Sequence, residues 1–211
     1  MFNAVLYVYL LYLHFKKIVM LFKNSILLLL LLCFSVTVSA QKYLSKNNAE
    51  VSRTLGQSTF TSTKTFYENI KEAPDFTVLA KVLKNGSTRQ QLEKLEVVTI
   101  FAVADESFLN LPKKSRDSIL DSPRILNSML TFLAVPGRVD SHSLKNEIAK
   151  TGATVNLKTI NGENLGVRNL NGTLQLVDSE NRTANIIASD FYHKNGFFHI
   201  IDGLVFPDSG E

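Results

Sequence analysis

After residue 40, hydrophobic residues cluster most densely in two separate stretches, and both patterns predict buried strands. The later stretch, Asn195–Pro207, begins with an Asn-Gly turn and continues as a nearly unbroken apolar run bounded by Gly203 and Pro207. The earlier stretch, Val97–Val103, is also apolar along most of its length. Strands that are apolar on both faces are buried on both faces. We therefore expect these two stretches to form the central strands of the fold.

Helical spacing of apolar residues is typical of the chain between residues 65 and 133. Asp75 is placed to cap a helix over 76–83, and Asp105 is placed to cap a short helix over 106–109 that follows the first buried strand. Ser122-Pro123 then opens a helix that runs to Leu133. We interpret Asp105 and Glu106 as helix-terminus residues and not as an acid/base pair.

The last third of the chain alternates short strand patterns with turn signals. Asn161-Gly162 and Asn171-Gly172 predict hairpin turns. The expected strands are 154–160, 166–170, 173–177 and 184–189. Helices that come first and strands that come last predict an α+β domain whose sheets fold against one another.

Residues 1–40 differ from the rest of the chain and predict an N-terminal leader. A basic residue, Lys23, precedes an apolar run over 26–38, and Val38-Ser39-Ala40 resembles a signal-peptidase site. We therefore expect a secretory signal peptide that is cleaved after Ala40, and a protein that is secreted or held at the cell surface or in the periplasm.

Alternatives to cleavage after Ala40 remain open. The run over 2–15 adds hydrophobic length, so the leader could stay as an uncleaved anchor, and membrane contact would then be confined to it. Both apolar runs are shorter than the roughly 20 residues that span a bilayer. Cys33 could be a lipoprotein acylation site, although Leu32 stands where a small residue is expected, and Met20 could be the true start. The bulk of the protein lies outside the cytoplasm in each case.

Removal of the leader changes the charge and the redox chemistry. The leader holds three of the 23 basic residues and none of the 19 acidic ones, so the remaining chain is nearly neutral. No clustered basic face is visible, which argues against a nucleic-acid partner. The only cysteine, Cys33, leaves with the leader, so the mature chain has no disulfide.

The stretch 41–62 is polar and predicts a spacer between the processing site and the domain. It is rich in Ser, Thr and Asn, with a short helix expected around 49–55. The domain proper is then expected to cover 63–208.

Candidate chemistry is sparse in the mature chain. His193 and His199 flank the Asn195-Gly196 turn, but no third ligand accompanies them at a spacing typical of a metal site. The sequence contains no nucleophile elbow, no phosphate-binding glycine loop and no zinc-protease motif. We predict no catalytic residues, no metal and no cofactor. His199 is expected to be a packed, hydrogen-bonded histidine, and Asp202 a turn or backbone partner.

Two of these stretches carry a family resemblance. The segment 99–108, TIFAVADESF, resembles the first signature of the fasciclin-type adhesion domain, and 195–207 resembles the second. Val135-Pro136-Gly137 resembles the end of the family's central tyrosine-histidine motif. The resemblance covers about Thr63 to Pro207 and implies a single-domain secreted or surface protein. The implied fold is a β-sandwich of two short sheets with several helices around it, the N-terminal half mostly helical.

The match is incomplete at two places. Val103-Ala104 stands where the family has Pro-Thr, and Phe132-Leu133 stands where it has Tyr-His, so the receptor role of that motif is not carried over. The matching positions, which we expect to be mainly structural, are Thr99, Phe101, Ala102, Asp105, Glu106, Phe108, Pro136, Gly137, Asn195, Gly196, His199, Ile201, Asp202, Gly203 and Pro207.

The resemblance implies a non-catalytic binding module for adhesion or attachment. Its partner would be a cell-surface or matrix protein or a polysaccharide. The leader and the absence of disulfides fit a bacterial envelope protein at least as well as an animal one. The alternative hypotheses are an envelope carrier of a small ligand, with an apolar cleft near the helix that ends at Phe132-Leu133, and a purely structural envelope component.

Overall fold

At the centre of the fold, strands β3 (Val98–Val103) and β9 (Gly196–Ile201) lie side by side and run parallel, from Val98 opposite Gly196 to Val103 opposite Ile201. The computed structural model describes residues 14–16, 49–84 and 86–208. Every residue of β3 is buried, and only the first residue of β9 is not. The prediction of two buried central strands is therefore confirmed, but β9 ends at Ile201 and the expected continuation to Phe206 has no strand structure.

One sheet of seven strands contains this pair. Its order is β4-β3-β9-β8-β7-β6-β5, and β3–β9 is its parallel pair while the other neighbours are antiparallel. The remaining strands are β4 (Ala134–Pro136), β5 (Val155–Lys158), β6 (Asn164–Leu170), β7 (Thr173–Val177) and β8 (Thr183–His193).

The expected sandwich of two short sheets is wrong, although the α+β class is confirmed. Strand β8 pairs with β7 through its first residues and with β9 through the rest, so hydrogen bonding continues from one half of the sheet to the other. Register shifts after Ile186 and after Ala188 bend β8 between the halves. At the far edges, the Ile160 N–H donates to the Ala134 carbonyl at 2.9 Å. The sheet therefore curls into a nearly closed barrel.

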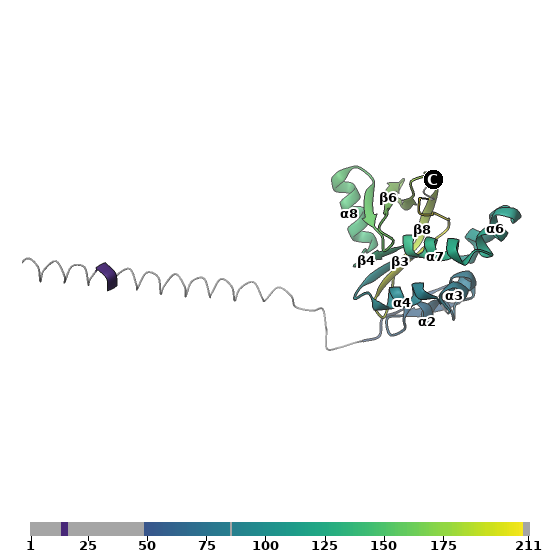
Figure 1. The fold of residues 1–211 in the computed structure, drawn as a ribbon, viewed down its shortest axis with the longest axis horizontal. Coiled ribbons are helices and arrows are strands. Elements are labelled where there is room, and N and C mark those ends of the chain that lie inside the picture. The colour runs from purple at the N-terminus through teal and green to yellow at the C-terminus, as the bar shows by residue number, and fades with distance from the viewer. Residues whose placement is uncertain (1–13, 17–48, 85, 209–211) are drawn as a thin grey trace, which may run out of the picture. The chain divides into compact units, whose positions relative to one another are not determined.

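Most of the helices precede residue 133, as expected. They are α2 (Phe66–Ile70), the short 3-10 helix η2 (Pro74–Phe76), α3 (Thr77–Leu83), α4 (Ser87–Lys94), α5 (Asp105–Leu109), α6 (Lys113–Leu120) and α7 (Pro123–Phe132). A later helix, α8 (Ser141–Thr151), was not predicted. Figure 1 shows α2, α3 and α4 on one side of β3, and α8 beside β6 on the other.

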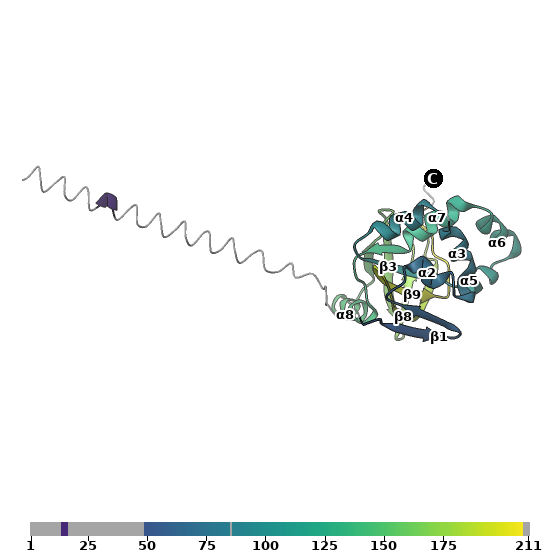
Figure 2. The ribbon, with the colours of Figure 1, turned by 90° about the horizontal axis from the view of Figure 1, so that it is seen from below.

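A hairpin replaces the predicted spacer over residues 49–62. Strands β1 (Ser52–Leu55) and β2 (Ser58–Thr61) pair with each other and lie against β8 (Figure 2), so the helix expected around 49–55 is wrong. The physical reason is Phe60, which is 1% exposed. Its ring makes edge-to-face contacts with Phe191 at 5.3 Å and Phe198 at 5.1 Å between centroids. The hairpin thus covers one face of the sheet.

The predicted leader lies almost wholly outside the described residues, and so does the spacer over 41–48. Within the described ranges, no helix combines the length and hydrophobicity needed to cross a membrane.

Replacing Phe60 with alanine should lower the free energy of unfolding by about 3–5 kcal/mol, because the change opens a cavity among three aromatic rings. Denaturant unfolding measures this loss. Gln57→Ala, at the exposed hairpin turn, is the matched control and should change stability by less than about 0.5 kcal/mol. A Phe60→Ala chain as stable as its parent would show that the hairpin is not part of the core.

Candidate functional site

The signature stretches meet on one face of the β3–β9 pair, where the loop after β4 crosses it. Thr99 of β3 is fully buried, and its hydroxyl donates to the Gly137 carbonyl at 2.8 Å and accepts from the Val139 N–H at 2.9 Å. His199 of β9 lies within 2.7 Å of the Val139 carbonyl through Nε2. One side chain from each signature strand therefore satisfies one backbone polar group of Val139. We call this arrangement the Val139 clasp.

His199 is a neutral histidine with one defined tautomer. A carbonyl oxygen only accepts, so Nε2 carries the proton that it donates to Val139. Nδ1 accepts from the Asp190 N–H at 3.2 Å, and the ring stacks on Phe101 at 5.4 Å between centroids. Burial lowers the pKa of His199, because the charged form would be desolvated. The ring is a structural member of the core, as the sequence suggested.

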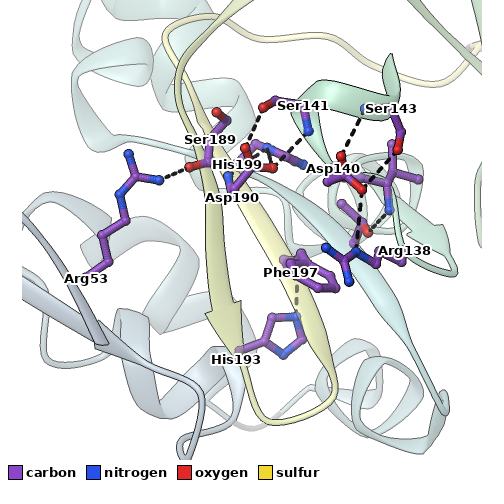
Figure 3. A network of polar contacts seen from close by, with 12 residues as sticks. Arg53, Arg138, Asp140, Ser141, Ser143, Ser189, Asp190, His193, Phe197 and His199 are labelled. Atoms are coloured by element: carbon purple, nitrogen blue, oxygen red, sulfur yellow. Dashed lines mark hydrogen bonds and ion pairs between the residues drawn. The ribbon is translucent and has the colours of Figure 1, made fainter. Parts of the chain in front are cut away.

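Asp190 links this histidine to the start of α8. It adopts a left-handed backbone conformation with φ of 63°, next to the second register shift of β8. Its carboxylate accepts from the Ser141 N–H at 2.8 Å and from the Ser141 hydroxyl (Figure 3). Partial burial acts to raise the pKa of Asp190, but the hydrogen bonds from Ser141 outweigh it and lower the pKa. Asp140, the N-cap of α8, accepts from the Ser143 N–H at 2.9 Å.

Ser141, Asp190 and His199 do not have the geometry of a hydrolytic triad. The Ser141 hydroxyl donates to the carboxylate, whereas a nucleophilic serine must donate to the histidine. The unprotonated Nδ1 of His199 accepts from the Asp190 N–H, and the protonated Nε2 donates to the Val139 carbonyl. The arrangement holds three segments of backbone together and offers no nucleophile–base pair.

Two arginines, Arg53 and Arg138, lie on opposite sides of the β8–β9 hairpin, as Figure 3 shows. The guanidinium of Arg138 lies 4.6 Å from the centroid of the Phe197 ring, and that of Arg53 lies 4.6 Å from Phe191. Arg53 also donates to the Ser189 carbonyl. These cation–π contacts shield rings at the edge of the core.

The Asn195-Gly196 turn is required by close packing. Asn195 Nδ2 donates to the carbonyls of Leu92 and Leu95 at the end of α4, at 2.9 and 3.1 Å. A Cβ on Gly196 would lie 1.8 Å from the Val98 carbonyl oxygen. Glycine therefore allows β9 to begin directly against β3.

Asp105 caps a helix, but not the one we predicted. Its carboxylate accepts from the N–H groups of Thr77 and Val78 at 2.8 and 3.0 Å, at the start of α3. The cap position of α5 is Ala104, which has no side-chain acceptor, and Asp105 is already the first residue of that helix. Asp75 caps neither helix and is exposed. The cap of α3 that was predicted for Asp75 is therefore supplied by Asp105, which lies far from α3 in the sequence.

The other signature positions are framework residues, through hydrogen bonds, close packing or burial in the core. Asp202 accepts from the Asn185 N–H at 2.7 Å, and a Cβ on Gly203 would lie 2.7 Å from the Thr183 carbonyl oxygen. Pro207 follows Phe206, whose N–H donates to the buried Asp178 at 3.0 Å. Pro136 ends β4 and Glu106 is exposed on α5, whereas the buried positions are Phe101, Ala102, Phe108 and Ile201.

No group of three or more histidine, cysteine or acidic side chains in the described part of the chain is arranged to hold a metal ion. His193 and His199 are each engaged by a backbone carbonyl instead, His193 Nε2 lying 3.2 Å from the Phe197 oxygen.

Several open depressions lie on the described part of the surface, and two of the larger ones have valine, leucine or isoleucine side chains in their walls. One, of about 700 Å³, lies between α3 and α7 and is lined in part by Val78, Val82 and Leu126. It borders α7, the helix beside which an apolar cleft was expected, but it lies at the opposite end of that helix from Phe132 and Leu133, which are buried in the core. The other, of about 680 Å³, lies between the β1–β2 turn, α5 and β8. Sequence reasoning found neither, because each combines residues from distant segments.

Comparison with known proteins identifies the family. The fasciclin domain model matches residues 74–207, more than half of the chain, so the chain belongs to the fasciclin domain family, whose members are generally non-catalytic modules associated with adhesion and binding. The structure is similar to that of a FAS1 domain pair from the insect cell adhesion molecule Fasciclin I, with a TM-score of 0.57 and 16% identity over 74% of this chain and 66% of that one.

Two curated relatives differ in how much of them this chain spans. Protein sll1483 of Synechocystis sp. is 24% identical over 161 residues, which cover 75% of this chain and 82% of that protein. Periostin of Homo sapiens is 19% identical over 144 residues, which cover 68% of this chain but only 16% of periostin.

Thr99→Val should destabilise the protein by about 1–3 kcal/mol, because it keeps the shape but leaves the Val139 N–H and the Gly137 carbonyl without the hydroxyl. Thr99→Ser, which retains the hydroxyl, is the control. Amide hydrogen exchange at Val139 should accelerate in the valine variant and not in the serine variant. Equal exchange in both would contradict the clasp.

Stability should fall as the pH drops from about 6.5 to about 4, and above about pH 5.5 histidines are the main titrating side chains. Burial lowers the pKa of His193 to about 4 and lowers the pKa of His199, so the unfolded chain binds more protons in this range. The contribution of His193 is roughly 3 kcal/mol, present above the unfolded pKa and lost toward pH 4.

Urea unfolding across this pH range tests the prediction. His193→Gln should flatten the pH dependence, and His142→Gln, which removes an exposed histidine of α8, should leave it unchanged. The same slope in all three proteins would refute the assignment to the buried ring.

Proposed function

We propose that this protein is a non-catalytic binding module that acts outside the cytoplasm, at a cell surface, in the periplasm or in a matrix. Family membership supports the class of function, and the basic and apolar leader supports export. The match to nearly the full length of a bacterial relative supports a one-domain envelope protein. Its role would be adhesion or attachment through contacts with proteins or polysaccharides.

The main observation in support of this proposal is that the polar side chains at the signature positions form hydrogen bonds within the domain. Thr99 and His199 bind Val139, Asn195 binds the end of α4, and Asp105 caps α3. Groups that hydrogen-bond the framework are not available to transform a substrate. Recognition is therefore assigned to the exposed surface that this framework holds in place.

The carrier hypothesis retains one favourable observation, the depression between α3 and α7. Its volume of about 700 Å³ falls within the size range of small-molecule sites, and valine and leucine side chains contribute to its walls. Val82→Gln would make this depression more polar, and Lys145→Gln on the exposed side of α8 is the control.

A binding survey separates the two functions. Residues 41–211, folded and heat-unfolded, would be applied to whole cells, envelope extract and a panel of polysaccharides. We expect saturable binding by the folded form alone. No binding to any macromolecule, together with a co-purified small molecule that Val82→Gln loses and Lys145→Gln retains, would replace adhesion by the carrier function.

A further inference from the structure

Three exposed aliphatic side chains from separate segments border one depression. Leu55 at the end of β1, Leu109 at the end of α5 and Ile187 in β8 are 41%, 64% and 58% exposed. All three line the depression of about 680 Å³. Single exposed apolar residues are ordinary, but a contiguous group marks an interaction site. The other large apolar side chains exposed in residues 49–84 and 86–208 are Val51, Val97 and Leu170, and none of these lines the depression.

Local backbone geometry accounts for the outward direction of Ile187. Ile186 is opposite Ile201 and Ala188 is opposite Ile200, so Ile187 is the additional residue of a β-bulge. Ala184 and Ile186 are buried, so the alternation of β8 places the next residue, Ile187, on the outer face. An isoleucine is therefore presented to the solvent at the point where the bulge bends the sheet.

Every titratable side chain that lines this depression is acidic. They are Asp75, Asp105 and Glu106. Asp105 is committed to the cap of α3, whereas the carboxylates of Asp75 and Glu106 are exposed and have no ion pair or hydrogen bond within the described residues. Two carboxylates beside the aliphatic group are therefore available to a cation.

The base of the depression is rigid. Phe76 and Ile200 line it and are each 2% exposed, and Ile200 belongs to the central strand β9. A partner would meet a preformed surface, so little ordering of the protein would oppose association.

We propose that this depression docks a segment of a partner protein in which a large apolar side chain is flanked by lysine or arginine. The apolar side chain of the partner would be buried against the three exposed aliphatic side chains. The carboxylates of Asp75 and Glu106 would attract the flanking cations. The same carboxylates repel an anionic membrane surface. This inference rests on the proposed binding function and assigns it a face and a class of partner.

Methyl-detected NMR of the protein labelled at isoleucine and leucine tests the proposal. The probe is a short synthetic peptide in which leucine and phenylalanine are flanked by lysines, and its matched control replaces the lysines with glutamates. We expect saturable shifts of the Leu55, Leu109 and Ile187 methyl signals with the lysine peptide alone. Added salt should weaken the binding.

Variants assign the binding to the depression. Glu106→Gln combined with Asp75→Asn should weaken binding about threefold to tenfold, the range for exposed charge pairs. Leu109→Ser and Ile187→Ser should also weaken it, while Leu170→Ser, an exposed leucine outside the depression, should not. All of these positions are exposed, and unfolding curves check that each variant folds.

Several outcomes would overturn the proposal. The lysine peptide could cause no saturable shift, or it could shift only methyl signals other than those of Leu55, Leu109 and Ile187. The glutamate peptide could bind equally well. The methyl signals of the depression could also shift without any peptide, because the protein self-associates. If Leu109→Ser and Ile187→Ser still bind the macromolecule found in the survey, the docking face is wrong while the binding function stands. A parent chain that binds no macromolecule at all would count against the binding function itself.

Discussion

The fold depends on the parallel pairing of β3 with β9, which buries both faces of the two strands. One face is covered by aromatic packing, and the other is crossed by the loop after β4. A buried loop must find partners for its backbone polar groups, because unpaired groups are expensive to bury. Thr99 and His199 supply these partners to Val139 from the two strands themselves. The three signature stretches are thus one physical unit.

The opposite face explains why the N-terminal hairpin belongs to the domain. Phe60 packs against Phe191 and Phe198, and Phe198 stands in β9 directly between residues that face the clasp. Because adjacent residues of a strand point to opposite faces, a single short strand joins the aromatic cluster to the polar clasp.

The sequence predicted what depends on local patterns and missed what depends on distant partners. Both buried strands, α7 with its Ser122 cap and the framework role of His199 followed from periodicity or resemblance. The capping partner of Asp105 lies 28 residues away, so proximity in sequence pointed to the wrong helix. The β1–β2 hairpin was not predicted because its strands are short and polar, and Phe60 is the one aromatic residue in them.

Two further misses have different physical causes. Helix α8 had local signals, since Asp140 caps it and Gly152 ends it in a left-handed conformation, but only Leu144 and Ile148 mark its buried face. The curl of the sheet follows from bulges in β8, and periodicity alone does not reveal them. The depression that Leu55, Leu109 and Ile187 border combines residues from five separate stretches of the chain and therefore exists only in the folded protein.

The most direct test of the central claim, that His199 is a neutral structural donor within the clasp, is the ¹⁵N spectrum of its imidazole ring. At neutral pH we predict a protonated Nε2 and an unprotonated Nδ1, as the hydrogen bonds to Val139 and from Asp190 require. A ring protonated on both nitrogens, or one with its single proton on Nδ1, would contradict the account.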